Sequence, residues 1–196
     1  MRGKKGDRTR KQLYDCAIQL FREQGYDQVT VDEIVKKAGM AKGTFYIYFR
    51  SKSDVIMEML RHYDDYYDRI MEDAAGLSCY EKLEAVIRGS CRFTRDVIGL
   101  DVIRVLYTNH LIKGKEHQGL LNEDRRLFQI ILLLVQEGQE QGIYTCRWNA
   151  EDLTLLILRG IRSVFFEWCS SGGNLDLTEQ CMLFLRVFCR GMLCVE

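Results

Sequence analysis

Helix-start signals recur along this chain of 196 residues, and no proline interrupts the segments that follow them. A Ser, Thr, Asn or Asp that is followed three residues later by an acidic residue can cap the free amide groups of a first helical turn. Such pairs begin at Thr30, Ser51, Ser78, Asn149 and Asp176. Because apolar residues then recur at helical spacing, and because proline would break a helix, the sequence predicts an all-α fold.

The pattern divides the chain into about nine helices in two domains. Glycines and polar residues separate the expected helices, which cover residues 8–24, 30–38, 42–49, 53–74, 78–98, 101–112, 121–141, 149–170 and 176–196. Residues 1–8 are expected to form a loose basic arm. The first three helices would form an N-terminal head, residues 1–52, and the remainder would form a helical bundle, residues 53–196.

The second and third expected helices have the spacing of a helix-turn-helix. Gly39 follows the second helix, where a residue with positive φ can end it. The third helix begins near Lys42, and its small, polar and aromatic residues are Lys42, Gly43, Thr44, Tyr46 and Tyr48. The major groove of DNA admits one helix, whose first turns present short polar side chains to base edges. The segment is therefore a candidate for binding duplex DNA, although a helical bundle with exposed tyrosines would have the same pattern.

Charge is distributed unevenly along the chain, although its formal net charge is zero. Residues 1–54 contain 12 Lys and Arg residues against 7 Asp and Glu residues, a net charge of +5, and residues 55–196 carry the compensating −5. A positive segment attracts the phosphates of nucleic acids. The excess coincides with the helix-turn-helix pattern, and it is modest for a segment of this length.

Residues 9–52 resemble the DNA-binding signature of the tetracycline-repressor (TetR) family of transcriptional regulators. The residues that carry the resemblance are Thr9-Arg10, Ala17, Leu20-Phe21, Gly25-Tyr26, Thr30-Val31, Ile34, Ala38-Gly39, Lys42 to Tyr46, Tyr48-Phe49 and Ser51-Lys52. Two positions depart from the signature. Ala41 stands where a capping Ser or Thr is common, and Ile47 replaces a usually polar residue and could contact a thymine methyl group.

The resemblance implies a ligand-responsive, DNA-binding transcriptional regulator. Most members of the family are repressors, so the resemblance implies a repressor that binds a palindromic operator as a homodimer and is released by a small-molecule inducer. It also implies that Thr30, the short helix near Lys42, Tyr46 and Lys52 contact DNA. Together with the other residues of the short helix, the expected DNA-binding set is Thr30, Lys42, Gly43, Thr44, Tyr46, Tyr48 and Lys52.

An inducer pocket among the helices between residues 53 and 170 is a further implication of the resemblance. Such pockets are commonly lined by aromatic side chains with a few polar groups. The candidates are Tyr63, Tyr66, Tyr67, Phe93, Tyr107, His110, Phe128 and Phe165. Taken by itself, each aromatic residue fits a helical core at least as well as a pocket, and the sequence does not identify the ligand.

The last two expected helices are apolar on nearly every side. A helix of this kind must be buried on more than one face, and no apolar run in the chain is long enough to cross a membrane. Pairing of two copies through a four-helix bundle would bury the additional face. The expected interface residues are Leu156, Phe165, Trp168, Phe184 and Phe188. The alternative is that both helices lie in the core of a monomer.

The rest of the sequence does not favour an enzyme, a cofactor or a metal site. The eight cysteines lack C-x-x-C spacing and mostly lie in apolar helical runs, where free cysteine behaves as a small hydrophobe. His62, His110 and His117 form no cluster with metal-ligand spacing, and no glycine-rich phosphate loop is present. The N-terminus has no apolar region typical of a signal peptide, so we expect a cytoplasmic protein. A redox role for the cysteines stays open.

Two other classes of protein fit the same helices without binding DNA. One is a helical protein that binds a small molecule, and the other is a helical adaptor. Retention on duplex DNA distinguishes these alternatives, because only a DNA-binding regulator would lose that retention steeply as salt is added.

Overall fold

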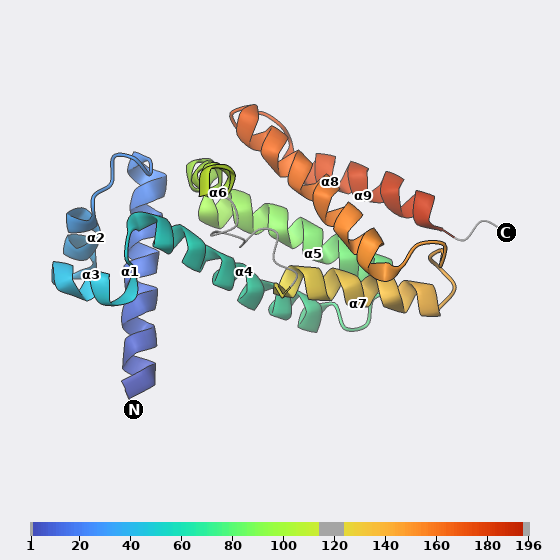
Figure 1. Cartoon of the computed structure of the whole chain (residues 1–196), viewed down its shortest axis with the longest axis horizontal. Helices are drawn as coiled ribbons and strands as arrows, with labels where there is room; N and C mark the ends of the chain where they lie inside the picture. Colours follow the sequence, from blue (N-terminus) through green and yellow to red (C-terminus); the bar gives the residue numbers. More distant parts are fainter. Residues whose placement is uncertain (1, 114–123, 194–196) are drawn as a thin grey trace. The chain divides into compact units, whose positions relative to one another are not determined.

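The computed structural model describes residues 2–113 and 124–193 and is all-α in these ranges, as the sequence predicts (Figure 1). Its helices are α1 (Arg2–Gln24), α2 (Val31–Ala38), α3 (Lys42–Tyr48), α4 (Lys52–Asp73), α5 (Cys79–Phe93), α6 (Leu100–Lys113), α7 (Arg126–Glu140), α8 (Ala150–Ser170) and α9 (Leu177–Met192). A π-helical turn, Thr94–Ile98, follows α5. An isolated antiparallel bridge joins Tyr144 to Leu193.

Two helix ends differ from those expected. Helix α1 begins at Arg2, so the expectation of a loose arm is wrong for residues 2–8. Arg and Lys favour helix, and a glycine within a helix costs only about 1 kcal/mol, so α1 continues through the basic segment. Helix α5 ends at Phe93, and the π-helical turn occupies the rest of the range expected for it. The expected start of the seventh helix, residues 121–123, lies outside the described residues.

The described residues form two compact units. Unit 1 contains residues 2–62 and 98–113, and unit 2 contains residues 63–97 and 124–193. Helix α4 therefore begins in unit 1 and ends in unit 2, and α6 groups with the N-terminal helices. This division differs from the boundary expected after residue 52. That boundary coincides with a helix start, and a helix start does not reveal which helices pack together.

Unit 1 has an apolar core between α1, α2, α3 and the first turns of α4. Helix α2 packs against both α1 and α3 (Figure 1). The buried side chains include Leu13, Ala17, Phe21, Ile34, Phe45, Phe49, Val55 and Met59. Burial of one large apolar side chain stabilises a fold by about 1.5–3 kcal/mol, so this core holds the two short helices α2 and α3 in a fixed arrangement.

Unit 2 is a bundle in which α5, α7, α8 and α9 pack on one another (Figure 1). Helices α8 and α9 approach closely because Gly160 faces Phe184, and a β-carbon at residue 160 would lie 1.9 Å from the Phe184 ring. Gly138 of α7 makes similar room for Tyr144, where a β-carbon would lie 2.1 Å from the ring. Both glycines are therefore required by packing.

Two ion pairs join α7 to the part of α4 that belongs to unit 2. Arg125 Nη2 lies 2.8 Å from Asp64 Oδ1, and Arg126 Nε lies 2.5 Å from Asp68 Oδ1. The Arg125 side chain is only 15% exposed, whereas the Arg126 side chain is 48% exposed. Because water and salt screen an exposed pair, the Arg125 pair contributes more to holding α7 on α4.

The seven cysteines in the described ranges are free thiols, and most of them are buried. Burial raises the pKa of Cys189 to about 12. A hydrogen bond with Cys91, together with burial, raises the pKa of Cys181. Such thiols stay protonated near neutral pH, and a protonated thiol is a poor nucleophile. Among the described residues, no group of His, Cys, Asp and Glu side chains is arranged to hold a metal ion.

Candidate nucleic-acid interface

Helix α2 is fixed at both ends by local hydrogen bonds. At its start, the Thr30 hydroxyl accepts from the Glu33 amide at 3.2 Å, and the Glu33 carboxylate accepts from the Thr30 amide at 2.7 Å and from the Thr30 hydroxyl at 2.8 Å. At its end, Gly39 has a φ of 66°, and the Met40 amide donates to the Val35 carbonyl at 2.9 Å. These bonds form a capping box and a left-handed glycine stop. The hydroxyl hydrogen of Thr30 is therefore engaged within the cap.

Helix α3 is buried on one face and exposed on the other. Phe45 and Phe49 are buried, and their ring centroids lie 5.5 Å apart. The exposed residues of α3 are Lys42, Gly43, Tyr46 and Ile47, and the partly exposed residues are Thr44 and Tyr48. The polar and aromatic side chains of the expected recognition helix therefore reach solvent rather than pack beneath other segments of unit 1.

Lys42, the first residue of α3, forms an ion pair with Asp32 of α2. Its Nζ lies 2.9 Å from the Asp32 Oδ2, and both side chains are more than half exposed. Because the ammonium donates to this carboxylate, the pKa of Lys42 is raised and the side chain stays positively charged. An exposed ion pair is weakly held, so Lys42 can turn from Asp32 to another anion.

Lys52, the first residue of α4, holds the loop that precedes α2. Its Nζ donates to the Tyr26 carbonyl at 2.8 Å and to the Val29 carbonyl at 2.6 Å, and it lies 4.5 Å from the centroid of the Tyr26 ring. An ammonium group has three N–H donors, and these two bonds use two of them. The sequence predicts Lys52 as a phosphate contact but gives no sign of this internal role, because its partners lie more than twenty residues away.

A second contact that the sequence does not reveal ties α1 to α4. Glu58 is buried, and its carboxylate lies 2.6 Å from Arg10 Nη2 and 3.5 Å from Arg61 Nη1. The Arg10 guanidinium also lies 5.5 Å from the centroid of the Phe49 ring. Arg10 thus connects the end of α3 with the first turns of α4, which supports the position of the exposed α3 face.

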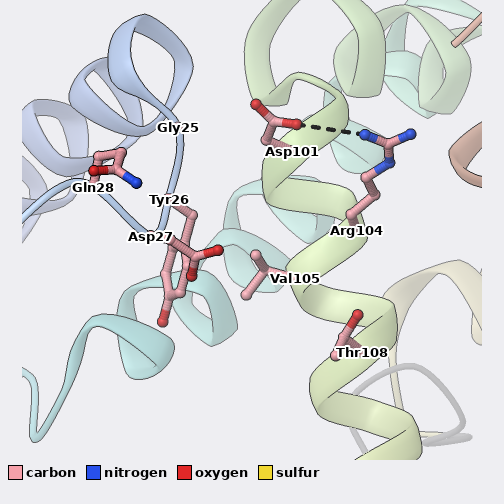
Figure 2. A pocket seen from close by; sticks show the side chains of 8 residues that line it. All are labelled: Gly25, Tyr26, Asp27, Gln28, Asp101, Arg104, Val105 and Thr108. Carbon is pink, nitrogen blue, oxygen red and sulfur yellow. Dashed lines mark ion pairs between the residues drawn. The ribbon is translucent and has the colours of Figure 1, made fainter. Parts of the chain in front are cut away.

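Unit 1 also contains an open pocket of about 490 Å³ between the loop that follows α1 and one face of α6. Figure 2 shows the lining residues, which are Gly25, Tyr26, Asp27 and Gln28 of the loop and Asp101, Arg104, Val105 and Thr108 of α6. Asp101 and Arg104 form an ion pair at 3.8 Å. None of the eight residues predicted to bind an inducer lines this pocket.

The predicted inducer-binding residues fall in both units. Those in unit 2 are Tyr63, Tyr66, Tyr67, Phe93, Phe128 and Phe165. Tyr107 and His110 belong to α6 of unit 1, and the side chain of His110 lies outside the described residues. The structure therefore brings together only part of the predicted set within one unit.

Four of the predicted residues in unit 2 form an aromatic cluster. The ring of Phe93 lies 4.7 Å from the Tyr63 ring and 4.9 Å from the Tyr66 ring, measured between centroids. Tyr63 stacks on Tyr67, whose hydroxyl accepts from the Ser90 hydroxyl at 3.1 Å. Burial raises the pKa of Tyr67 to about 12, so its hydroxyl remains protonated at neutral pH.

The exposed apolar surface of α8 and α9 differs from the expected interface. Phe165 and Trp168 are buried within unit 2. Leu156 is 43% exposed, and Phe184 and Phe188 are partly exposed. Leu183 and Val187, which the expected set omits, are 49% and 65% exposed. No helix within the described ranges has both the length and the apolar character that a membrane span requires.

A compact three-helix arrangement presents α3 to solvent in the segment of the chain with a net positive charge, and this is the arrangement of a helix-turn-helix DNA-binding domain. Comparison with known proteins agrees. Residues 13–59 match the family model described as bacterial regulatory proteins, tetR family. The matched residues include α2 and α3, so the N-terminal part of this chain is similar to the transcriptional regulators of that family.

Curated relatives of the chain are also transcriptional regulators. The chain is 27% identical over 192 residues to the HTH-type transcriptional repressor KstR2 of Rhodococcus jostii, a match that covers 97% of this chain and 93% of KstR2. It is 36% identical over 78 residues to the fatty acid metabolism regulator protein of Bacillus subtilis. This match covers 39% of this chain and 40% of that relative.

Solved structures share the whole fold at lower sequence identity. Thermus thermophilus FadR, a TetR-family repressor in complex with lauroyl-CoA, has a TM-score of 0.73 at 23% identity and covers 95% of this chain and 96% of its own. Bacillus subtilis FadR in complex with stearoyl-CoA has a TM-score of 0.75 at 22% identity and covers 93% of this chain and 98% of its own.

Proposed function

We propose that this protein is a ligand-responsive repressor that binds a near-palindromic DNA operator as a homodimer and leaves it when a small-molecule inducer binds. The observation that carries this proposal is the exposed face of α3, which presents Lys42, Gly43 and Tyr46 while Phe45 and Phe49 hold the helix in the core. The proposed site of action is the cytoplasm, where a bacterial regulator has access to chromosomal DNA.

In this proposal α3 lies in the major groove of the operator. Thr44, in the first turn, reaches base edges, and the absence of a side chain at Gly43 lets the DNA approach the backbone. Lys42 and Tyr46 reach phosphates on either side of the groove. Lys52 donates its third N–H to a phosphate while it keeps its two carbonyl partners. The remaining members of the proposed DNA-binding set are Thr30 and Tyr48.

The apolar surface of α8 and α9 supports the homodimer. Leu183 and Val187 lie four residues apart on one face of α9 and are both exposed, and Leu156 is exposed on the adjacent helix α8. A two-fold axis would pair this surface with its own copy and bury it. The same axis would give the assembly two copies of α3, which is the arrangement that a palindromic operator requires.

Unit 2 is the proposed inducer-binding part of the protein. It contains the aromatic cluster around Phe93 and residues 94–97 of the π-helical turn Thr94–Ile98, a conformation that is frequent at functional sites. FadR repressors of the same fold carry lauroyl-CoA or stearoyl-CoA, and one relative is a fatty acid metabolism regulator. Fatty acyl-CoA thioesters are therefore the proposed ligand class.

Selection of bound sequences from a random duplex pool tests the DNA-binding part. The expected result is one near-palindrome, bound by two protomers with an affinity that falls steeply as salt is added. A Tyr46→Ala variant should bind this duplex more weakly, whereas the control variant Lys11→Ala, which changes an exposed residue of α1, should not. Absence of salt-dependent binding to any duplex would remove the proposal.

Titration of the protein–operator complex with acyl-CoA thioesters of increasing chain length tests the ligand class. Release of the duplex at a saturable ligand concentration, with a preferred chain length, is the expected result. If free CoA and every thioester leave the complex intact, acyl-CoA is rejected as the inducer class while the DNA-binding part of the proposal stands.

A further inference from the structure

We propose that Ile47 and Gly43 together form an apolar reading surface on α3 that recognises the C5 methyl group of a thymine in each operator half-site. This inference rests on the proposed function, because it requires α3 to lie in the major groove. It adds the base and the chemical group that determine part of the sequence preference.

Ile47 exposes a large apolar side chain to solvent. The side chain is 76% exposed, the largest value among the large apolar side chains of the described residues. The neighbouring positions in the helix, Phe45 and Phe49, show that α3 does bury apolar side chains where the core is available. Ile47 instead lies on the opposite face, beside the exposed Tyr46.

Neither the backbone conformation nor the packing of the chain requires glycine at residue 43. Its φ is not positive, and a β-carbon built on it would meet nothing within 4 Å. The contrast is with Gly138 and Gly160, where a β-carbon would collide with an aromatic ring. A glycine inside a helix is also less favourable than alanine, so the absence of a side chain at residue 43 disfavours α3 without improving any contact of the chain.

Gly43 and Ile47 lie on the same face of α3, because residues four apart in a helix are neighbours on its surface. A β-carbon built on Gly43 would meet nothing within 4 Å, so open space lies one turn before Ile47 on this face of α3. In the major groove the C5 methyl group of thymine is the apolar group on a base edge. A methyl group that enters this space contacts Ile47, while the bare backbone at Gly43 lets α3 sit deep enough to reach it.

The charges around this surface favour DNA over a protein partner. Exposed cations on and next to α2 and α3 include Lys36, Lys42 and Arg50, whereas Lys37 is paired with Glu23 of α1. Asp32, an exposed acid of α2, is paired with Lys42. An exposed apolar side chain on a segment that also carries exposed cations matches a thymine methyl group that lies between two rows of phosphates.

Replacement of single thymines by deoxyuridine in the selected operator tests the inference, because this exchange removes the C5 methyl group alone. Wild-type protein should lose affinity about fourfold when one symmetry-related thymine in either half-site is replaced, which is the effect expected for one buried methyl group. The Ile47→Ala variant should bind the thymine and the deoxyuridine operators equally. The Leu111→Ala variant, changed at a 72% exposed leucine of α6, should keep the wild-type difference.

Three results would overturn the inference. In the first, wild-type protein binds the operator tightly, and no thymine replacement changes the affinity. In the second, Ile47→Ala keeps the full wild-type sensitivity to deoxyuridine. In the third, Ile47→Ala changes the oligomeric mass in light scattering, which would assign Ile47 to a contact between proteins. Failure of wild-type protein to bind any duplex is a different result, because it removes the proposed function itself.

Discussion

The Gly43→Ala variant separates the stability of α3 from its fit to DNA. The added β-carbon meets nothing within 4 Å in the free protein, and the backbone of Gly43 does not need glycine. Alanine is favoured over glycine in a helix by about 0.5–1 kcal/mol. We therefore expect the variant to be more stable than the wild type, with a Tm about 1–4 °C higher for a protein of this size.

The same substitution should weaken operator binding. If DNA occupies the space beside Gly43, a methyl group there must displace it, and an extra methyl group in a close-packed contact costs about 1–3 kcal/mol. Two half-sites double this cost, so the lower limit of about 2 kcal/mol corresponds to a loss of affinity of about thirtyfold. A gain in stability together with a loss of binding is the result that the structure predicts.

Thermal unfolding followed by circular dichroism and fluorescence anisotropy with the selected operator measure the two effects. Gly76→Ala is the matched control, because Gly76 is also exposed, has no positive φ, and would place its β-carbon in open space. That control should leave operator affinity unchanged. If Gly43→Ala binds the operator as tightly as wild type, the close approach of DNA to residue 43 is refuted.

Three further variants test other parts of the structure. Lys52→Ala removes two hydrogen bonds to backbone carbonyls, so it should lower the free energy of unfolding by about 1–3 kcal/mol and weaken binding to all duplexes alike, whereas Lys11→Ala should do neither. Val187→Glu should halve the mass measured by light scattering, whereas Leu133→Glu on α7 should not; an unchanged dimer would exclude α9 from the interface. The pKa of Glu33 is lowered because the amide and hydroxyl of Thr30 donate to its carboxylate, so its stabilising effect is present above pH 4.5 and is lost as the pH falls through the lowered pKa. Glu33→Gln keeps an acceptor without the titration, so its stability difference from wild type should shrink over that interval in acid unfolding measurements, and a constant difference would contradict the assignment.

Local features of unit 1 could be predicted from the sequence. The capping box of Thr30 and Glu33, the stop at Gly39 and the burial of Phe45 and Phe49 all depend on residues within a few positions of one another. Their spacing fixes which side chains share a helix face, and the short-range hydrogen bonds follow from it. The exposed side of α3 follows in turn, because the other side carries the two phenylalanines.

Contacts between distant residues could not be predicted in this way. The sequence identifies Lys52 only as a basic residue at a helix start. The fold shows in addition that its ammonium group donates to the carbonyl oxygens of Tyr26 and Val29. Phe165 and Trp168 are apolar like Leu156, yet the first two face the bundle and the third faces solvent. On a helix that is apolar all round, periodicity does not distinguish a core position from an interface position.

The double attachment of Lys52 has an evolutionary consequence. A side chain that joins α4 to the loop before α2 and, in the proposed function, also donates to an operator phosphate cannot be altered for one purpose alone. A substitution at Lys52 that changed operator affinity would also destabilise the fold. Substitutions that change operator affinity should therefore accumulate among related proteins at exposed positions such as Ile47 instead.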